Sequence, residues 1–406
     1  MRGIYKGGLT AIVPSGSQAK RIDAGRDEIS TNHEYLRLVT DFSARRLAGL
    51  GLFAGLRWIY AALSLLPVRQ GTVVFTSYPD ASDNALAMYR YLSQQMPRLR
   101  TIWLVGPQQT QSLPALRQAR LLSREGFRAM HALATAQYVF HTHGIFRFAR
   151  RRRCQTIVNL WHGMPMKTIG TYDKTGPRLP LGDVTIASSE MFRPIMARAF
   201  AMDEADVLVV GQPRNDPMVR AARAAAPTSV LWMPTYRRSG QGEIRHDSPF
   251  SSVAMEAVLR RLDDGLAGTA TRLILKLHPM DALNLELPHD FANVEVIRRG
   301  DVHEDLPLLM ARSRRLITDY SSAAIDFAVL GRPIGYFCPD RDDYDRGFIP
   351  EVAVPFFAAG EELADVEALI AFVLDKAQPE QGETPLVQDR DDRSAERLWA
   401  ALEQRQ

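Results

Sequence analysis

From Gly71 onward, short hydrophobic runs alternate with longer stretches in which hydrophobic residues recur at helical spacing. Short runs rich in β-branched residues, separated by helices, are typical of buried strands in a parallel sheet. A helix is predicted near residues 83–96. The strands predicted in this first series are 72–77, 101–105, 138–140, 156–159, 184–187 and 207–210.

The pattern restarts after an alanine-rich segment, Ala221–Pro227, that reads as the end of a helix. The second series has predicted strands at 229–233, 273–277, 294–297, 316–318 and 334–337, and predicted helices near 250–265, 304–312, 321–330, 361–376 and 390–404. We therefore predict an α/β protein with two Rossmann-like halves joined near 211–228. The predicted parts are a loosely ordered arm (1–46), an amphipathic helix (47–69), two Rossmann-like domains (70–212 and 213–380) and a C-terminal helix (381–406).

The segment Leu47–Val68 is hydrophobic and has about the length of a membrane-spanning helix. Arg57 lies near its centre, however, and a central arginine costs roughly 2.5–3.5 kcal/mol on insertion scales. Arg45, Arg46 and Arg69 flank it. We expect an amphipathic helix that lies on a membrane surface or packs on the protein, rather than one that spans the bilayer.

Charge and cysteine content narrow the function classes. The chain of 406 residues has 50 Lys and Arg against 46 Asp and Glu, and this net charge of +4 does not suggest a nucleic-acid-binding protein. The arginine run at Arg147–Arg153 leaves two alternatives equally open: contact with anionic lipid or a phosphate-bearing acceptor, and an ordinary solvated loop. Two cysteines, Cys154 and Cys338, argue against a disulfide framework.

Several motif classes are missing from the sequence. His141 and His143 form a pair, but no carboxylate or cysteine at ligand spacing accompanies them, so no metal site is expected. Neither a GxGxxG nor a Walker A motif occurs, which argues against a nicotinamide oxidoreductase or a P-loop enzyme. The N-terminal residues lack the pattern of a signal peptide, and we take the cytoplasm as the default location.

The segment that follows the predicted strand 156–159 has the composition of an active-site turn. His162 stands at the end of a strand and can serve as a general base near neutral pH. Gly163 permits a backbone to approach a ligand closely, and Lys167 is placed to meet a phosphate. The alternative is a capping histidine beside a purely structural turn.

Polar residues also follow the strands of the second series, where ligands of open parallel sheets bind. Arg237 and His278, with Lys276 just before it, are suited to binding a pyrophosphate. The alternative is that Pro234 and Pro279 merely end these strands.

Ser321 and Ser322 are predicted at a helix start, where free N–H groups and hydroxyls bind anions. The alternative is that Asp319 or one of the serines caps the helix. Asp326 interrupts the hydrophobic face of that helix and could accept from a ribose hydroxyl or orient a cation.

Together these motifs resemble the CDP-glycerol glycerophosphotransferase family, whose enzymes build teichoic acids and related polyol-phosphate polymers. The motifs occur in the family's order over roughly residues 70–350. The matching segments are Leu160–Gly170, Gly211–Asp216, Met233–Arg237, Leu275–Pro279 and Thr318–Pro333.

The resemblance implies a GT-B-like fold with the two sheets facing across a cleft, the acceptor at the first domain and the nucleotide donor at the second. It implies that an acceptor hydroxyl attacks the phosphorus bearing the glycerol of CDP-glycerol, and that CMP leaves without any cofactor. An acceptor on a lipid carrier or a glycan and an anionic membrane surface are the implied partners. The implied catalytic residues are His162 and His278, the implied donor-binding residues are Arg237, Lys276, Ser321, Ser322 and Asp326, and Lys167 and Arg214 are further phosphate contacts.

One segment departs from the family pattern. Arg346–Phe348 is not followed by the usual Gly-Pro-containing segment, which leaves the polyol and the acceptor open. A transferase that uses CDP-ribitol or a nucleotide sugar is the first alternative. A non-catalytic protein that binds a polymer or a lipid carrier is the second, and the presence of His162, His278 and both serines argues against it.

Overall fold

The chain divides into two compact units, which are considered separately: Met1–Ile59 with Phe146–Phe148, and Tyr60–Ile145 with Ala149–Gln406. In the first unit the described structure is most of helix α2 (Ala48–Leu63); the arm predicted at 1–46 lies outside the described residues. The computed structural model describes residues 48–109, 113–146, 152–173, 182–235, 252–277, 287–288, 290–297, 305–339, 341, 347–375, 377 and 381–405.

The first sheet has seven strands in the order β3-β2-β1-β4-β5-β6-β7, and every pair is parallel. Six of them confirm the strands predicted from the hydrophobic runs. The edge strand β3 was not predicted because its sequence, Arg-Leu-Leu-Ser, is short and half polar, which an edge position tolerates. The strands are β1 (Arg69–Thr76), β2 (Arg100–Val105), β3 (Arg120–Ser123), β4 (Ala136–His141), β5 (Thr156–Asn159), β6 (Val184–Ala187) and β7 (Val207–Val209).

The second sheet has six strands in the order β10-β9-β8-β11-β12-β13, again all parallel. The order 3-2-1-4-5-6 within it is that of a Rossmann sheet. The strands are β8 (Ser229–Met233), β9 (Arg272–Lys276), β10 (Val294–Ile297), β11 (Ser313–Thr318), β12 (Ile334–Tyr336) and β13 (Glu361–Glu362).

Helices connect and cover the strands. Three were not predicted: α4, α5 and α10. The predicted helix 361–376 begins late, because Glu361 and Glu362 form an edge strand and Asp365 caps the helix by accepting from Ala368 N at 2.8 Å. The helices are α3 (Asp83–Gln95), α4 (Phe127–Thr135), α5 (Phe192–Phe200), α6 (Asp216–Ala224), α7 (Ser252–Leu266), α8 (Leu306–Ala311), α9 (Ala323–Ala328), α10 (Pro350–Ala358), α11 (Val366–Leu374) and α12 (Ser394–Gln404).

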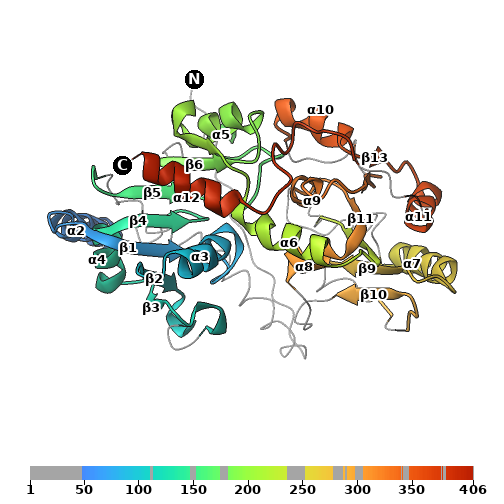
Figure 1. The fold of residues 1–406 in the computed structure, drawn as a ribbon, viewed down its shortest axis with the longest axis horizontal. Helices are drawn as coiled ribbons and strands as arrows, with labels where there is room; N and C mark the ends of the chain where they lie inside the picture. The colour runs from blue at the N-terminus through green and yellow to red at the C-terminus, as the bar shows by residue number, and fades with distance from the viewer. Residues whose placement is uncertain are drawn as a thin grey trace, which may run out of the picture. The chain divides into compact units, whose positions relative to one another are not determined.

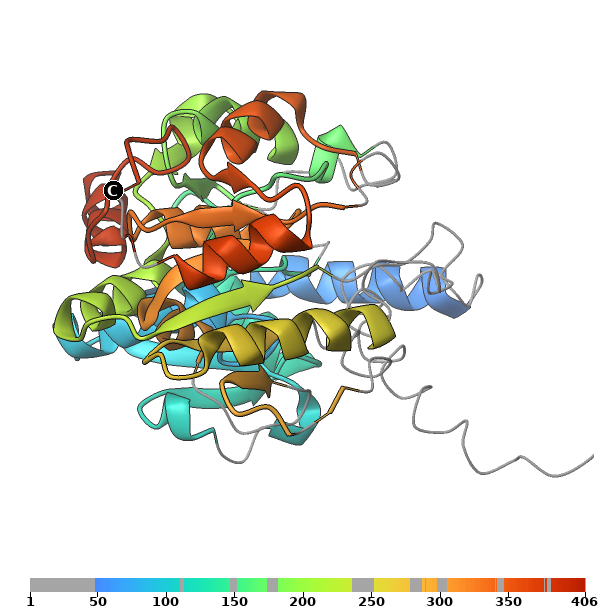
Figure 2. The ribbon, with the colours of Figure 1, turned by 90° about the vertical axis from the view of Figure 1, so that its right-hand side faces the viewer.

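Three clusters of buried hydrophobic side chains make up the core. One belongs to the first sheet, and one lies between the second sheet and helices α7 and α11, which contact each other (Figure 2). The third joins residues of both halves, among them Phe192 and Met196 from α5 and Tyr320 and Phe327 from the region of α9. This shared core makes the two Rossmann-like halves one compact unit.

The last helix, α12, returns to the first half of the chain (Figure 1). Leu398 and Trp399 pack in the cluster of the first sheet, where Trp399 lies 5.0 Å from Tyr138 between ring centroids. Asp216, at the start of α6, accepts from the backbone N–H groups of Ser394 (3.0 Å) and Ala395 (2.9 Å). The helix predicted at the C-terminus therefore completes the core of the first sheet.

The helix predicted at 47–69 is present as α2, which ends at Leu63, with Trp58 78% exposed and Arg57 also exposed. Of the helices in the described residues, none is long and hydrophobic enough to cross a membrane. In the arginine run, Arg152 binds backbone carbonyls of Ala134 and Leu66, so this residue has a structural role. Arg147, Arg150 and Arg151 lie outside the described residues.

The strand orders locate the expected ligand site. Each sheet reverses its direction of winding at one point, between β1 and β4 in the first sheet and between β8 and β11 in the second. Ligands of open parallel sheets bind beyond the carboxyl ends of the strands at such a switch point. Tyr78 and His143 follow β1 and β4, and Thr235 and Asp319 follow β8 and β11.

Candidate active site

The turn that carries His162 follows β5 and has an unusual backbone. Trp161 has a φ of +49° and Gly163 a φ of +132°, conformations that L-residues rarely adopt. Asn159 Oδ1 accepts from Trp161 N at 3.1 Å. The buried Asn84 amide donates to the carbonyls of Leu160 and Trp161, both at 3.2 Å. The turn is thus held in place by side chains from β5 and α3.

The hydrogen bond of the His162 ring defines its tautomer. Nδ1 lies 3.3 Å from the carbonyl oxygen of Thr142. A carbonyl can only accept, so Nδ1 carries the proton and Nε2 has the free lone pair. Burial lowers the pKa of the His162 imidazole; the Thr142 hydrogen bond and Asp83 oppose this effect, and Arg214 adds to it. The half-buried ring is therefore neutral at physiological pH, as a general base must be.

Arg214 links the His162 turn to helix α9. Its Nη1 donates to the His162 carbonyl at 2.8 Å and to Asp83 Oδ1 at 3.0 Å. Its Nη2 donates to Asp326 Oδ2 at 2.5 Å, and its Nε donates to Asp326 Oδ1 at 3.3 Å. Gln212 Nε2 also donates to Asp326 Oδ1, at 2.6 Å. One guanidinium therefore contacts α3, the His162 turn and α9.

Arg214 faces two carboxylates, Asp326 and Asp83. Burial raises the pKa of the Asp326 carboxyl, and the Arg214 guanidinium opposes that shift. Burial alone would lower the pKa of Arg214, but Asp326 and Asp83 raise it above the ordinary value. Arg214 is therefore always charged. Both Arg214 and Asp326 have partners inside the protein, whereas the resemblance implied a phosphate contact for Arg214 and donor binding for Asp326.

Gly163 packs closely against Arg214 and Ser322. A Cβ atom at this position would lie 2.7 Å from Arg214 Nη2 and 3.3 Å from Ser322 Oγ. Only glycine fits both this space and the positive φ. Gly163 was expected to let the backbone approach a ligand, and the structure places the Arg214 side chain against it. The same contact brings the hydroxyl of Ser322 next to the His162 turn.

The serines lie where β11 leads into α9, which is shorter than the predicted helix at 321–330. Ser321 Oγ accepts from Ala323 N at 3.3 Å, so this serine helps to cap the helix. Asp319 is buried and accepts from Thr235 N at 3.0 and 2.9 Å, which ties the end of β8 to the end of β11. Ser321 and Ser322 are both partly accessible at the switch point of the second sheet.

The remaining predicted site residues are spread over both halves. Lys276 ends β9 and is half-buried, and burial lowers its pKa. Lys167 lies where backbone segments of the two halves are hydrogen-bonded to each other. Thr168 N donates to Gly347 O at 3.0 Å, and Ile349 N donates to Met166 O at 2.8 Å. Arg237 and His278 lie outside the described residues.

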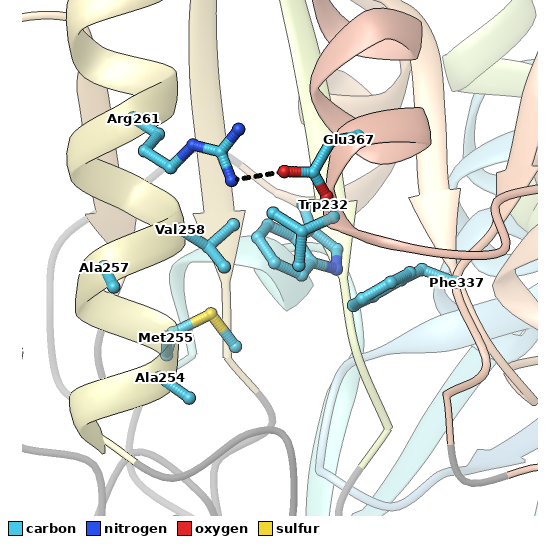
Figure 3. A pocket seen from close by; sticks show the side chains of 9 residues that line it. Trp232, Ala254, Met255, Ala257, Val258, Arg261, Phe337 and Glu367 are labelled. Carbon is cyan, nitrogen blue, oxygen red and sulfur yellow. Dashed lines mark hydrogen bonds and ion pairs between the residues drawn. The ribbon is translucent and has the colours of Figure 1, made fainter.

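A separate pocket of about 410 Å³ opens on the second half between α7 and α11 (Figure 3). Trp232, Met255 and Phe337 make its walls hydrophobic. Arg261 and Glu367, its charged lining residues, pair with each other at 2.8 Å. A pocket of this kind does not suit a diphosphate.

Residues 58–397 match the family described as CDP-glycerol:poly(glycerophosphate) glycerophosphotransferase. The chain belongs to this family of transferases. The expected fold is confirmed as well: the wall teichoic acid polymerase TagF, in a variant soaked with CDPG, has a TM-score of 0.64 and 20% identity over 93% of this chain and 98% of that one. The chain therefore has the GT-B-like fold, with two Rossmann-like sheets.

Two relatives differ in their polyol. The teichoic acid poly(glycerol phosphate) polymerase of Staphylococcus epidermidis is 26% identical over 69% of this chain and 42% of its own length. The teichoic acid ribitol-phosphate primase of Bacillus spizizenii is 28% identical over 77% of this chain and 84% of its own length. The chain thus spans less than half of that polymerase but most of that primase.

Proposed function

We propose that the protein transfers glycerol phosphate from CDP-glycerol to a hydroxyl group of an acceptor and releases CMP. The observation that supports this most directly is the neutral His162, whose Nδ1 faces the Thr142 carbonyl and whose Nε2 is left to accept a proton. Membership of the glycerophosphotransferase family supports the same reaction class.

In the proposed reaction, Nε2 of His162 takes the proton from the acceptor hydroxyl as its oxygen attacks the phosphorus that bears the glycerol. A new P–O bond forms, and the bond between this phosphorus and the oxygen of CMP breaks. Phosphoryl transfer needs chiefly positioning and neutralisation of charge. His162 is therefore required for chemistry rather than for donor affinity.

The second half is proposed to hold the donor. Ser322 Oγ would contact a Cβ at position 163, so a diphosphate bound at Ser321 and Ser322 lies within reach of the His162 turn. Lys276 ends a strand of the same sheet, and Arg237 and His278 follow strands of that sheet in the sequence. Arg214 remains a proposed phosphate contact because its guanidinium and Ser322 Oγ lie against the same glycine, Gly163. Lys167 remains one only from its position in the matching segment.

CDP-ribitol is the first alternative donor, and the match to a ribitol-phosphate primase over most of both chains favours testing it. A nucleotide sugar is a further alternative. The acceptor is proposed to be linked to a lipid or a glycan in teichoic-acid-like or capsular polymer synthesis. The exposed Trp58 and Arg57 of α2 support a peripheral location at an anionic membrane surface on the cytoplasmic side.

The decisive experiment is a CMP-release screen of the full chain with CDP-glycerol and CDP-ribitol, and a parallel release screen with nucleotide sugars. Each donor is tested with a glycerol-phosphate-primed lipid acceptor. We expect release from CDP-glycerol that depends on the acceptor and on His162. CMP release from CDP-ribitol but not from CDP-glycerol would identify CDP-ribitol as the donor. Donor binding without any release would favour the non-catalytic alternative.

A further inference from the structure

The imidazole of His162 has a second histidine as its neighbour. The rings of His143 and His162 are stacked, with centroids 4.3 Å apart and planes inclined by only 11°. Trp161 contacts the same His162 ring at 4.1 Å, and Tyr78 meets His143 with its edge at 5.9 Å. His162 is thus part of a row of four rings drawn from the ends of β1, β4 and β5.

Thr142 connects the two imidazoles. Its carbonyl oxygen lies 3.3 Å from Nδ1 of His162, and its hydroxyl lies 2.8 Å from Nδ1 of His143. The neighbouring His141 is tied separately, since its Nδ1 accepts from Gly144 N at 3.0 Å. The loop after β4 therefore fixes the plane of His143, and His143 presents a flat face to His162.

The groups around the rings act against a charge on His143. Burial lowers the pKa of His143 to about 3; His162, His141 and Arg124 add to this shift, and Asp83 opposes it. Arg124 is itself paired with Asp80. The charged groups that face His162 are Asp83 from α3 and Arg214 from the turn after β7. His143 is thus a neutral aromatic surface at neutral pH.

We propose that His143 is a positioning residue for His162: its stacked ring fixes the orientation of the His162 imidazole and shields one face of that ring from water. This inference rests on the proposed role of His162 as the base. A flat neutral ring is what the role requires, because stacking fixes a plane and excludes solvent without a proton exchange. His143 itself neither gives nor takes a proton.

The test compares His143→Phe, which keeps a flat ring, with His143→Ala, which removes it. For His143→Ala we expect kcat to fall roughly 10- to 100-fold, since a misplaced catalytic group costs about this much. The KM for CDP-glycerol should stay unchanged. With one face of His162 open to water, the acid limb of the pH profile of kcat/KM should move to higher pH. His143→Phe should keep both the rate, within about threefold, and the position of the acid limb.

His131→Ala is the matched control, because His131 lies on α4 and contacts Arg69 rather than the site. Its rate and pH profile should equal those of the wild type. An inactive His143→Phe beside an active His143→Gln would show that hydrogen bonding or proton exchange by His143 is needed, and an unmoved acid limb in His143→Ala would also overturn the proposal. If the wild type releases no CMP, or His162→Ala is fully active, the proposed function fails instead.

Discussion

Arg214 and Asp326, 112 residues apart in the chain, form a largely buried ion pair, with side chains 18% and 9% exposed, through two hydrogen bonds of 3.3 and 2.5 Å. The same guanidinium donates to the carbonyl of His162 at 2.8 Å. Asp326 belongs to α9 in the second half, and His162 to the turn after β5 in the first. The position of the candidate base therefore depends on a carboxylate in the other half of the protein.

Replacing Asp326 with Ala should destabilise the protein by about 3 kcal/mol, because breaking a buried pair leaves the remaining charge without its partner. Asp83 still faces Arg214, which keeps the loss at the lower end of the range. Urea unfolding measures this change, and calorimetry measures the affinity for CDP. A variant of normal stability with weakened CDP binding would instead support a direct donor contact for Asp326.

The matched control for the Asp326 substitution is Glu367→Gln, which breaks the ion pair with Arg261. The side chain of Arg261 is 53% exposed and that of Glu367 is 68% exposed. Exposed pairs contribute only about 0–1 kcal/mol, so the unfolding free energy should barely change. A similar loss in both variants would mean that burial of the Arg214–Asp326 pair has no particular effect.

Gly163→Ala should lose both stability and activity. The new methyl group would lie 2.7 Å from Arg214 Nη2 in a backbone with φ of +132°. Gly126→Ala separates the two causes, because Gly126 also has a positive φ (+92°) but has open space around it. Backbone strain alone costs about 1–3 kcal/mol, and only the Gly163 variant should also lose CMP release. Equal activity in the two variants would show that the contact with Arg214 is dispensable.

His162→Ala and His162→Asn should release CMP at least about 100-fold more slowly than the wild type while binding CDP normally. The base must be neutral, so the rate falls as pH drops through the pKa of His162. Because burial lowers that pKa from the ordinary value of 6.5, the wild type should remain active below pH 6.5. Full activity of His162→Asn in the CMP-release assay would exclude His162 as the base.

His143 should also make the stability of the protein depend on pH. Its pKa is about 3 in the folded state against an ordinary value of 6.5, so the unfolded chain binds a proton more readily between these values. The stability that the neutral ring contributes is complete above pH 6.5 and is lost as pH falls toward 3. His143→Phe should therefore flatten the fall in unfolding free energy below pH 6.5, measured by urea unfolding at several pH values. An unchanged slope would contradict the buried, neutral state of His143.

The hydrophobic runs predicted the central strands because a buried parallel strand needs little but non-polar residues. The edge strands β3 and β13 escaped prediction, since Arg120–Ser123 and Glu361–Glu362 carry polar residues that their exposure allows. His162 and Ser322 could be predicted as site residues because they follow strands, and the carboxyl ends of parallel strands meet at one edge of a sheet. The pairing of Arg214 with Asp326 could not be predicted, since nothing local in either segment encodes a contact between the halves.

The stack of His143 on His162 was missed for a related reason. His141 and His143 were considered only as a possible metal-binding pair, and no metal site was expected there. A ring-on-ring contact leaves no spacing signal in the sequence. The feature that could have indicated this contact is the position of His143 just beyond β4, at the switch point of the first sheet. A polar ring at that position is a candidate for a contact with any residue that follows the neighbouring strand β5.

The return of α12 to the first sheet affects how the chain folds during its synthesis. Asp216 and its partner Ser394 are 178 residues apart, so the first sheet leaves the ribosome long before the helix that completes its core. Until then, the surface that receives Leu398 and Trp399, with Tyr138 within it, has no cover from α12. Exposed hydrophobic surface of this kind favours aggregation of nascent chains. The first half is thus expected to reach its final stability only after the last residues of α12 have been translated.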